Sequence, residues 1–135
     1  MKDEITNLAE IKKKIVEFRD KRGWQDNKAK DLAISVVLEA SELLEHFQWG
    51  MWDEEEVKKD PEKMEEIHRE VADVMIYLMA FCSVFDIDIT DAIMEKLEWN
   101  EKKYPLSKFN PHWQDREYYY KVKKDYRNEN KQISK

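Results

Sequence analysis

Residues 32–49 read LAISVVLEASELLEHFQW, and this stretch decides how the chain is expected to fold. Its apolar residues recur three and four positions apart, which is typical of an amphipathic helix; they include Leu32, Val36, Leu43 and Phe47. Glu39 and Glu42 fall within or beside this apolar stripe, and residues three apart on a helix project to the same side. The stretch therefore predicts a core-facing helix that carries a pair of carboxylates.

A second acidic pair occurs in residues 70–77, EVADVMIY, where Glu70 and Asp73 border another apolar stripe. Carboxylates at the edge of a core are costly unless they are paired or bound to a cation. Four converging carboxylates cannot neutralise one another, so they favour a hard divalent ion, Mg²⁺, with Mn²⁺ as a substitute. The alternative is that each pair lies on a solvated helix face, because 40% of the residues are charged. Two such pairs on two neighbouring helices favour the metal site.

The composition predicts an all-α fold in one domain. The chain has 135 residues, and its two glycines and three prolines leave little material for the turns of a β-rich protein. Apolar periodicity and stop signals predict helices over about 3–21, 31–49, 61–85 and 90–104, with an acidic loop at 51–59. These four helices are expected to form a four-helix bundle.

Local signals set the expected helix ends. Gly23 is predicted at the C′ position of the first helix, and Asp31 as the N-cap of the second. Asp60 followed by Pro61 predicts an N-cap and a first helical residue. Thr90 is expected to cap the fourth helix, which should end before Pro105.

The chain changes character near its end, so residues 1–110 are expected to form the domain and 111–135 a separate tail. The tail is rich in tyrosine, lysine and arginine, and it is expected to be irregular, with a last stretch that is disordered or weakly helical. Its aromatic residues are expected to pack on the bundle or on a neighbouring subunit. A nucleic-acid-binding arm is the less favoured interpretation.

Charge and cysteine content limit the partners. The net charge of −6 argues against nucleic-acid binding by the whole domain. The lone Cys82 falls in an apolar helical run and is expected to be a buried, reduced thiol. The sequence shows no signal peptide and no apolar stretch of membrane-spanning length, so a cytoplasmic protein without membrane contact is expected.

Read together, these motifs resemble the MazG-type all-α nucleoside triphosphate pyrophosphohydrolases, and most closely their small dCTP-pyrophosphatase-like branch. The resemblance is carried by E-x-x-E at 39–42, E-H-F-Q-W at 45–49, E-x-x-D at 70–73 and N-x-x-K-Y-P at 100–105. It spans about residues 11–105 and leaves the tail outside. One departure lies at 27–31, NKAKD, where relatives often carry a segment with His and Pro; it bears on base selectivity.

The resemblance implies Mg²⁺-dependent cleavage of a nucleoside triphosphate, such as dCTP, to the monophosphate and pyrophosphate. It implies metal ligation and catalysis by Glu39, Glu42, Glu70 and Asp73, one of the glutamates acting on the attacking water. Base contacts are implied for Trp24, Trp49 and Tyr77, and phosphate contacts for Lys96, Asn100, Lys103 and Tyr104.

A bundle this small does not easily enclose a nucleotide, so a homodimer or homotetramer is expected, with the site beside a subunit interface. Rival functions within the fold are dUTP or dUDP hydrolysis, removal of damaged nucleotides, and phosphoribosyl-ATP hydrolysis, whose branch lacks the 47–49 and 103–105 context. From a different class, the chain could be a non-catalytic helical interaction module that uses its aromatic tail.

Overall fold

The structure, a computed structural model, describes residues 2–49, 53–110 and 113–133. These residues form helices and one two-stranded sheet, which confirms the predicted all-α class. The chain divides into two compact units, residues up to 89 and residues from 90 onward, and each is described by itself. The four-helix arrangement within one bundle therefore stays a prediction.

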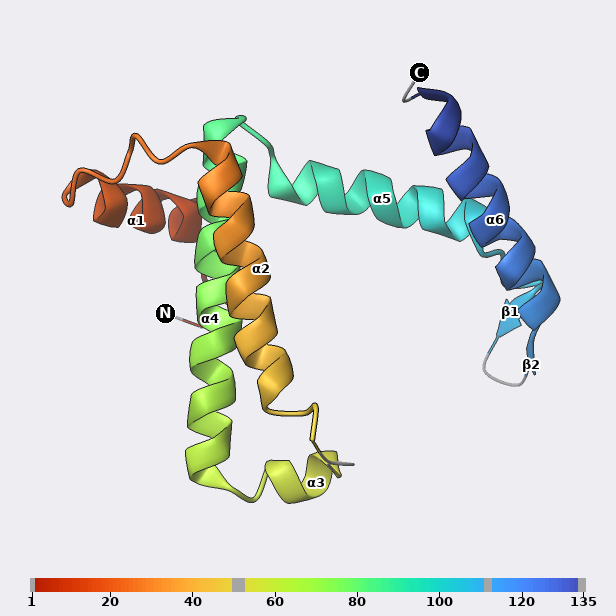
Figure 1. Cartoon of the computed structure of the whole chain (residues 1–135), viewed down its shortest axis with the longest axis horizontal. Helices are drawn as coiled ribbons and strands as arrows, with labels where there is room; N and C mark the ends of the chain where they lie inside the picture. The colour runs from red at the N-terminus through yellow and green to blue at the C-terminus, as the bar shows by residue number, and fades with distance from the viewer. Residues whose placement is uncertain (1, 50–52, 111–112, 134–135) are drawn as a thin grey trace. The chain divides into compact units, whose positions relative to one another are not determined.

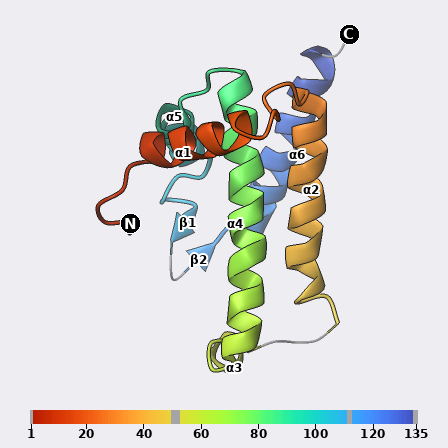
Figure 2. The ribbon, with the colours of Figure 1, turned by 90° about the vertical axis from the view of Figure 1, so that its left-hand side faces the viewer.

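The first unit is built on a pair of long helices, α2 (Ala29–Glu45) and α4 (Pro61–Val84). They run side by side in opposite directions (Figures 1 and 2). Helix α1 (Leu8–Asp20) packs against α4, and Lys12 Nζ donates a hydrogen bond to the carbonyl oxygen of Ile87 (3.2 Å). The short helix α3 (Glu54–Val57) lies in the connection between α2 and α4.

The most buried residues of this unit gather near the start of α2 and the end of α4. Leu32 of α2 is buried, as are Met79, Ala80 and Cys82 of α4, so the expectation of a buried, unpaired thiol agrees with the structure. Arg19 of α1 is also buried, and its guanidinium donates to the carbonyl oxygen of Trp24 (2.8 Å). The core of the helix pair is therefore anchored at the end where α1 packs.

Two predicted helix ends are confirmed by their hydrogen bonds. The Gly23 N–H donates to Asp20 and the Trp24 N–H to Arg19, and Gly23 has a φ of 70°. This is the Schellman pattern, in which a left-handed residue at C′ suits glycine. Asp60 accepts from the N–H groups of residues 62 and 63, and Pro61 begins α4.

Other boundaries differ from the sequence-based expectation. Helix α1 begins at Leu8 because Asn7 caps it, not near residue 3. Helix α2 begins two residues before Asp31, so Asp31 lies in its first turn. A negative charge at this position interacts favourably with the helix dipole. It ends at Glu45, four residues before the expected Trp49.

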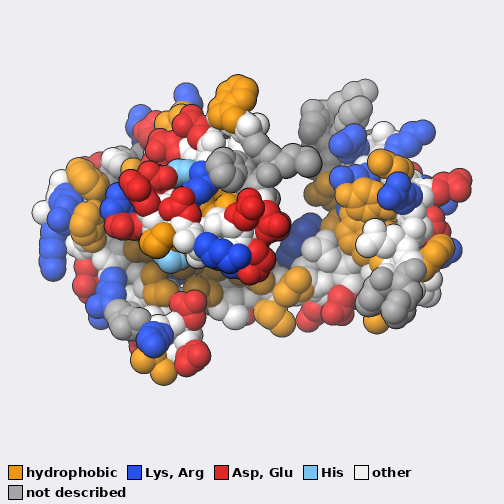
Figure 3. Space-filling view, turned by 90° about the horizontal axis from the view of Figure 1, so that it is seen from below, with side chains coloured by type: hydrophobic (Ala, Val, Ile, Leu, Met, Phe, Trp, Pro, Cys, Tyr) orange, Lys and Arg blue, Asp and Glu red, His pale blue; other side chains and the backbone are white. Residues whose placement is uncertain are grey.

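The predicted acidic loop and the predicted cap at Thr90 are also corrected. The loop contains α3, because Asp53 accepts a hydrogen bond from the N–H of Glu55 and so caps a single turn. Acidic side chains crowd this end of the first unit, which faces the viewer in Figure 3. Thr90 lies inside α5 (Ile89–Lys103) rather than before it, and that helix ends ahead of Pro105, as predicted.

The second unit contains α5, a hairpin and the helix α6. Strands β1 (Phe109–Asn110) and β2 (Trp113–Gln114) pair antiparallel, with Phe109 opposite Gln114. Helix α6 (Arg116–Ile133) follows, and Asp115 caps it by accepting from the N–H of Tyr118 (2.8 Å). The expected irregular tail is thus a hairpin and a regular helix, because its tyrosines find aromatic partners within the same unit.

None of the helices in the described part of the chain is both long enough and apolar enough to cross a membrane.

Candidate metal and substrate site

Three of the four predicted acidic ligands meet between α2 and α4. Glu39, Glu70 and Asp73 each offer a carboxylate oxygen, and these oxygens all lie within 4.8 Å of one another. All three side chains are half-buried. The group could hold a metal ion, and carboxylate oxygens at this spacing are the donors that a hard divalent cation takes.

The helix geometry explains why these three converge. Glu70 and Asp73 are one turn apart on α4, so they share a face with each other and with Tyr77, one turn further on. Glu39 lies in the middle of α2, and the two helices run in opposite directions side by side. Packing the apolar stripes of the two helices together therefore brings carboxylates from both to one place.

Glu42 stands outside this group of three but acts on it electrostatically. Its side chain is exposed on α2. The pKa of Glu39 is raised above its ordinary value, first by burial and then by the negative charges of Glu42, Asp73 and Glu70. All four carboxylates thus contribute to one negative region, in which the protonation of Glu39 relieves part of the repulsion.

The three aromatic residues predicted to contact the base occupy different surroundings. Trp24, in the α1–α2 connection, packs edge-on against Phe18 (6.0 Å between ring centres) and is half exposed. Trp49 follows α2 and is 86% exposed. Tyr77 is half-buried on the face of α4 that carries the acidic pair.

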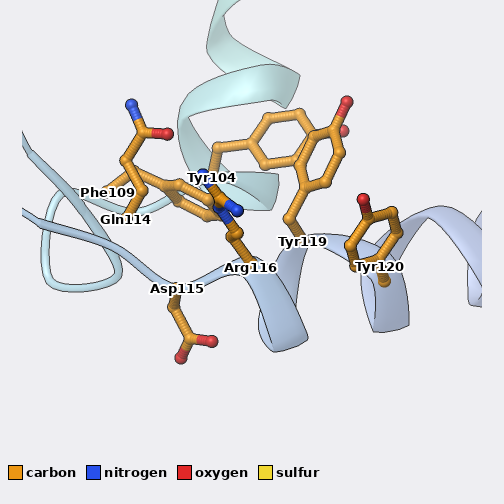
Figure 4. Close-up of a pocket in the computed structure, with 7 residues that line it drawn as sticks. All are labelled: Tyr104, Phe109, Gln114, Asp115, Arg116, Tyr119 and Tyr120. Atoms are coloured by element: carbon orange, nitrogen blue, oxygen red, sulfur yellow. The ribbon is translucent and has the colours of Figure 1, made fainter.

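The predicted phosphate-contacting residues all lie in the second unit, on α5 or just after it. Lys96 and Lys103 both place their ammonium groups over the ring of Trp99. Asn100, between them on the helix, is half-buried. Tyr104 lines an aromatic cavity of about 660 Å³ (Figure 4).

Aromatic neighbours largely define that cavity. Tyr104 meets Phe109 edge-on (5.5 Å) and Tyr119 at 5.9 Å between ring centres. Figure 4 shows Tyr119 and Tyr120 rising from α6 on one side, while the Asp115 carboxylate points away. Contacts with neighbouring aromatic rings therefore hold the ring of Tyr104 in place.

Two residues in contact with the predicted phosphate-binding lysines were missed by the sequence interpretation. Trp99 lies three residues after Lys96 and four before Lys103, and this spacing could have placed it on the same helix face. Tyr126 of α6 packs on Trp99 (5.5 Å), a contact that spacing could not reveal because it joins two helices.

The MazG-like family matches residues 34–131, which include both acidic pairs. The chain belongs to the MazG-like family. The resemblance noted in the sequence is thereby confirmed, and it extends further than expected, since it continues past residue 105 into α6.

This MazG-like chain is similar to proteins that are named pyrophosphatases. It is 30% identical to dCTP pyrophosphatase 1 of Mus musculus over 101 residues and to that of Homo sapiens over 100 residues. Each alignment covers 73% of this chain but 59% of the relative, so the chain spans less than two thirds of their length. A crystal structure of a pyrophosphatase from Archaeoglobus fulgidus is 39% identical, with a TM-score of 0.66, and the match covers 78% of this chain and 98% of that one.

Proposed function

We propose that this protein is a divalent-metal-dependent nucleoside triphosphate pyrophosphohydrolase that uses Mg²⁺, with Mn²⁺ as a substitute. The observation that carries the proposal is the meeting of Glu39, Glu70 and Asp73 between two helices. Membership of the MazG-like family and the similarity to proteins named pyrophosphatase support the same reaction.

The proposed reaction breaks the bond between the α- and β-phosphates. The oxygen of water forms a bond to phosphorus, pyrophosphate leaves with the bridging oxygen, and the nucleoside monophosphate remains. Bound Mg²⁺ would supply neutralisation of the phosphoryl oxygens and a more acidic water. Glu39, Glu70 and Asp73 would hold the ion, with Glu42 turning in from its exposed position.

The residues themselves explain why a cation suits this place. An anionic triphosphate would be repelled by four carboxylates, so the acidic group serves such a substrate only through bridging ions. The raised pKa of Glu39 reflects the same crowding of negative charge. One of the glutamates would orient or deprotonate the attacking water.

The leading substrate is dCTP, because relatives that are 30% identical are named dCTP pyrophosphatase. The test is a turnover panel of canonical and modified ribo- and deoxyribonucleoside triphosphates with Mg²⁺, in which pyrophosphate and phosphate release are measured separately. We expect pyrophosphate release, fastest with dCTP. Preference for dUTP or dUDP would assign the rival activity of the same fold, and no turnover of any nucleotide would favour the non-catalytic interaction module.

A homodimer or homotetramer is part of the proposal, because the first unit by itself carries many exposed apolar side chains. On α2 and α4 the exposed large side chains include Ile34, Val37, Leu38, Val71 and Met75. Large exposed apolar patches are rare on monomeric proteins, and contact with another protein is one of the roles that they mark. A second copy would cover them and could complete a pocket for the base.

Trp49 is the aromatic residue with the clearest expected effect on substrate affinity. At 86% exposure it does little packing within one chain, so its indole face is available to a base. Trp49→Ala should raise KM by about 5- to 150-fold, the worth of one stacking contact. The value of kcat should change less, because stacking is equal in the ground and transition states.

Trp49→Phe is the matched control, since it keeps an aromatic face and should restore most of the affinity. Inhibition by free pyrophosphate should be unaltered in both variants. If Trp49→Ala leaves KM unchanged or dissociates the oligomer on size-exclusion chromatography, Trp49 is a packing residue and does not contact the base. The base pocket should then be sought around Tyr77.

The remaining assignments follow the family resemblance and are proposals on the same footing. Trp24 and Tyr77 would contact the base, and Lys96, Asn100, Lys103 and Tyr104 the phosphates. The cytoplasmic location expected from the sequence also stays a prediction.

A further inference from the structure

Two lysines of α5 converge on a single tryptophan. Lys96 and Lys103 are seven residues apart, so their backbones are separated by about 10 Å along the helix axis. Their ammonium nitrogens nevertheless lie 3.8 Å and 4.4 Å from the centre of the same Trp99 ring. The same indole therefore holds two ammonium groups that would otherwise extend independently into solvent.

Helix α6 supplies the second wall of this arrangement. The ring of Tyr126 meets Trp99 edge-on, with 5.5 Å between ring centres. Lys103 Nζ lies 4.1 Å from the centre of the Tyr126 ring, and Lys96 Nζ lies 5.8 Å from it. Both ammonium groups thus face the electron-rich surfaces of two aromatic rings from two helices.

The charges around the lysines leave them available to an anion. Among the side chains that the structure describes, in residues 2–49, 53–110 and 113–128, neither Lys96 nor Lys103 forms an ion pair with a carboxylate. Asp125 of α6 lines the same small cavity as Lys103 without pairing with it. Two ammonium groups that contact the same ring repel each other, and an anionic polyphosphate beside them would relieve that repulsion.

We propose that Tyr126 and Trp99 form an aromatic shelf that pre-positions Lys96 and Lys103 to receive the pyrophosphate part of the substrate. The inference rests on the proposed function and gives α6 a role in it. Holding a lysine in one conformation before binding removes part of the rotamer entropy that binding would otherwise cost. Tyr126 is on this account a positioning residue that acts through the two lysines.

The experiment compares Tyr126→Leu with Tyr126→Phe in the full chain. Leucine keeps apolar bulk but removes the ring, whereas phenylalanine keeps the ring and loses only the hydroxyl. Binding of pyrophosphate with Mg²⁺ is measured by calorimetry, and KM and kcat with the best nucleotide. We expect Tyr126→Leu to weaken pyrophosphate binding and raise KM together, by about 3- to 30-fold, with kcat within about twofold of the wild type. Tyr126→Phe should retain the wild-type values.

Tyr120→Leu is the matched control on the same helix. Tyr120 is 68% exposed, and its ring packs edge-on against Tyr119. It should leave pyrophosphate binding unchanged. Thermal melting of all three variants separates positioning from folding, because loss of packing alone would lower the melting temperature without weakening pyrophosphate binding.

The inference is overturned if Tyr126→Leu binds pyrophosphate as tightly as the wild type, or if Tyr126→Phe is as weak as Tyr126→Leu. It is also overturned if Lys96→Met and Lys103→Met leave binding unchanged, since the lysines would then not be the phosphate subsite. The calorimetric readout does not depend on turnover. A failure of the proposed activity in the nucleotide panel is therefore distinguishable from a failure of the shelf.

Discussion

Replacing Asp73 with asparagine should lower kcat by about a thousandfold or more, because metal stabilisation of the transition state is worth several kcal/mol. The change removes one negative charge from the three-carboxylate group and hardly alters side-chain size. Folding should persist, since the carboxylate is half-buried among like charges that oppose folding rather than favour it. Steady-state kinetics with the best nucleotide measures the loss, and far-ultraviolet circular dichroism checks the helical content.

Glu45→Gln is the matched control for that substitution. Glu45 is exposed at the end of α2, one turn beyond Glu42, and lies outside the acidic group. It should retain activity within about twofold of the wild type. Glu42→Gln should fall at least tenfold below this control if Glu42 turns in to bind the ion. Full activity in both Glu42→Gln and Asp73→Asn would refute the assignment of the metal site.

Saturating Mg²⁺ should raise the melting temperature of the nucleotide-free protein by roughly 5–10 °C. Binding to the native state at a hundred times the dissociation constant adds about 2.7 kcal/mol, and each kcal/mol shifts the melting temperature of a chain of this size by roughly 2–4 °C. The structural reason is the mutual repulsion of the carboxylates, which a divalent ion cancels.

The raised pKa of Glu39 sets how the stability of the metal-free protein changes with pH. Because the folded state raises its pKa, the folded protein binds the proton more tightly than the unfolded chain does. Stability is therefore lost as the pH rises from 4.5, the ordinary glutamate value, through the raised pKa, and the full penalty applies above that pKa. Without metal, Glu39→Gln should melt at a higher temperature than the wild type. Mg²⁺ should raise the melting temperature of Glu39→Gln by less than it raises that of the wild type.

Differential scanning calorimetry with a chelator and with millimolar Mg²⁺ measures both shifts. Glu45→Gln should respond to Mg²⁺ as the wild type does. Superimposed wild-type curves would mean that the free protein binds no ion. A further scan with a non-hydrolysable triphosphate would then show whether an ion enters with the nucleotide.

Local signals in the sequence predicted most of the elements that the structure contains. Asp60 with Pro61 fixed the start of α4, and Gly23 the end of α1, because each acts on backbone groups within a few residues. The local signals predicted the wrong helix boundary where another nearby side chain caps the helix. Asn7 caps α1 and makes that helix shorter than predicted, and Asp53 caps α3, a helix that was not predicted. The tail was predicted to be at most weakly helical, whereas α6 is a regular helix, because its tyrosines pack on residues from outside the tail, such as Trp99 and Tyr104.

By itself, the sequence determined the all-α class, the MazG-like membership and the two acidic pairs, because i, i+3 spacing on a helix is a property of one segment. Only the tertiary structure decided which carboxylates meet. Packing α2 against α4 joins Glu39 to Glu70 and Asp73 and leaves Glu42 exposed, although Glu42 is as near to Glu39 along the helix as Asp73 is to Glu70. Likewise, the contact between Tyr126 and Trp99 depends on how α6 lies against α5. Convergence between helices depends on their relative rotation and depth, which the packing of side chains from both helices sets and which neither segment encodes alone.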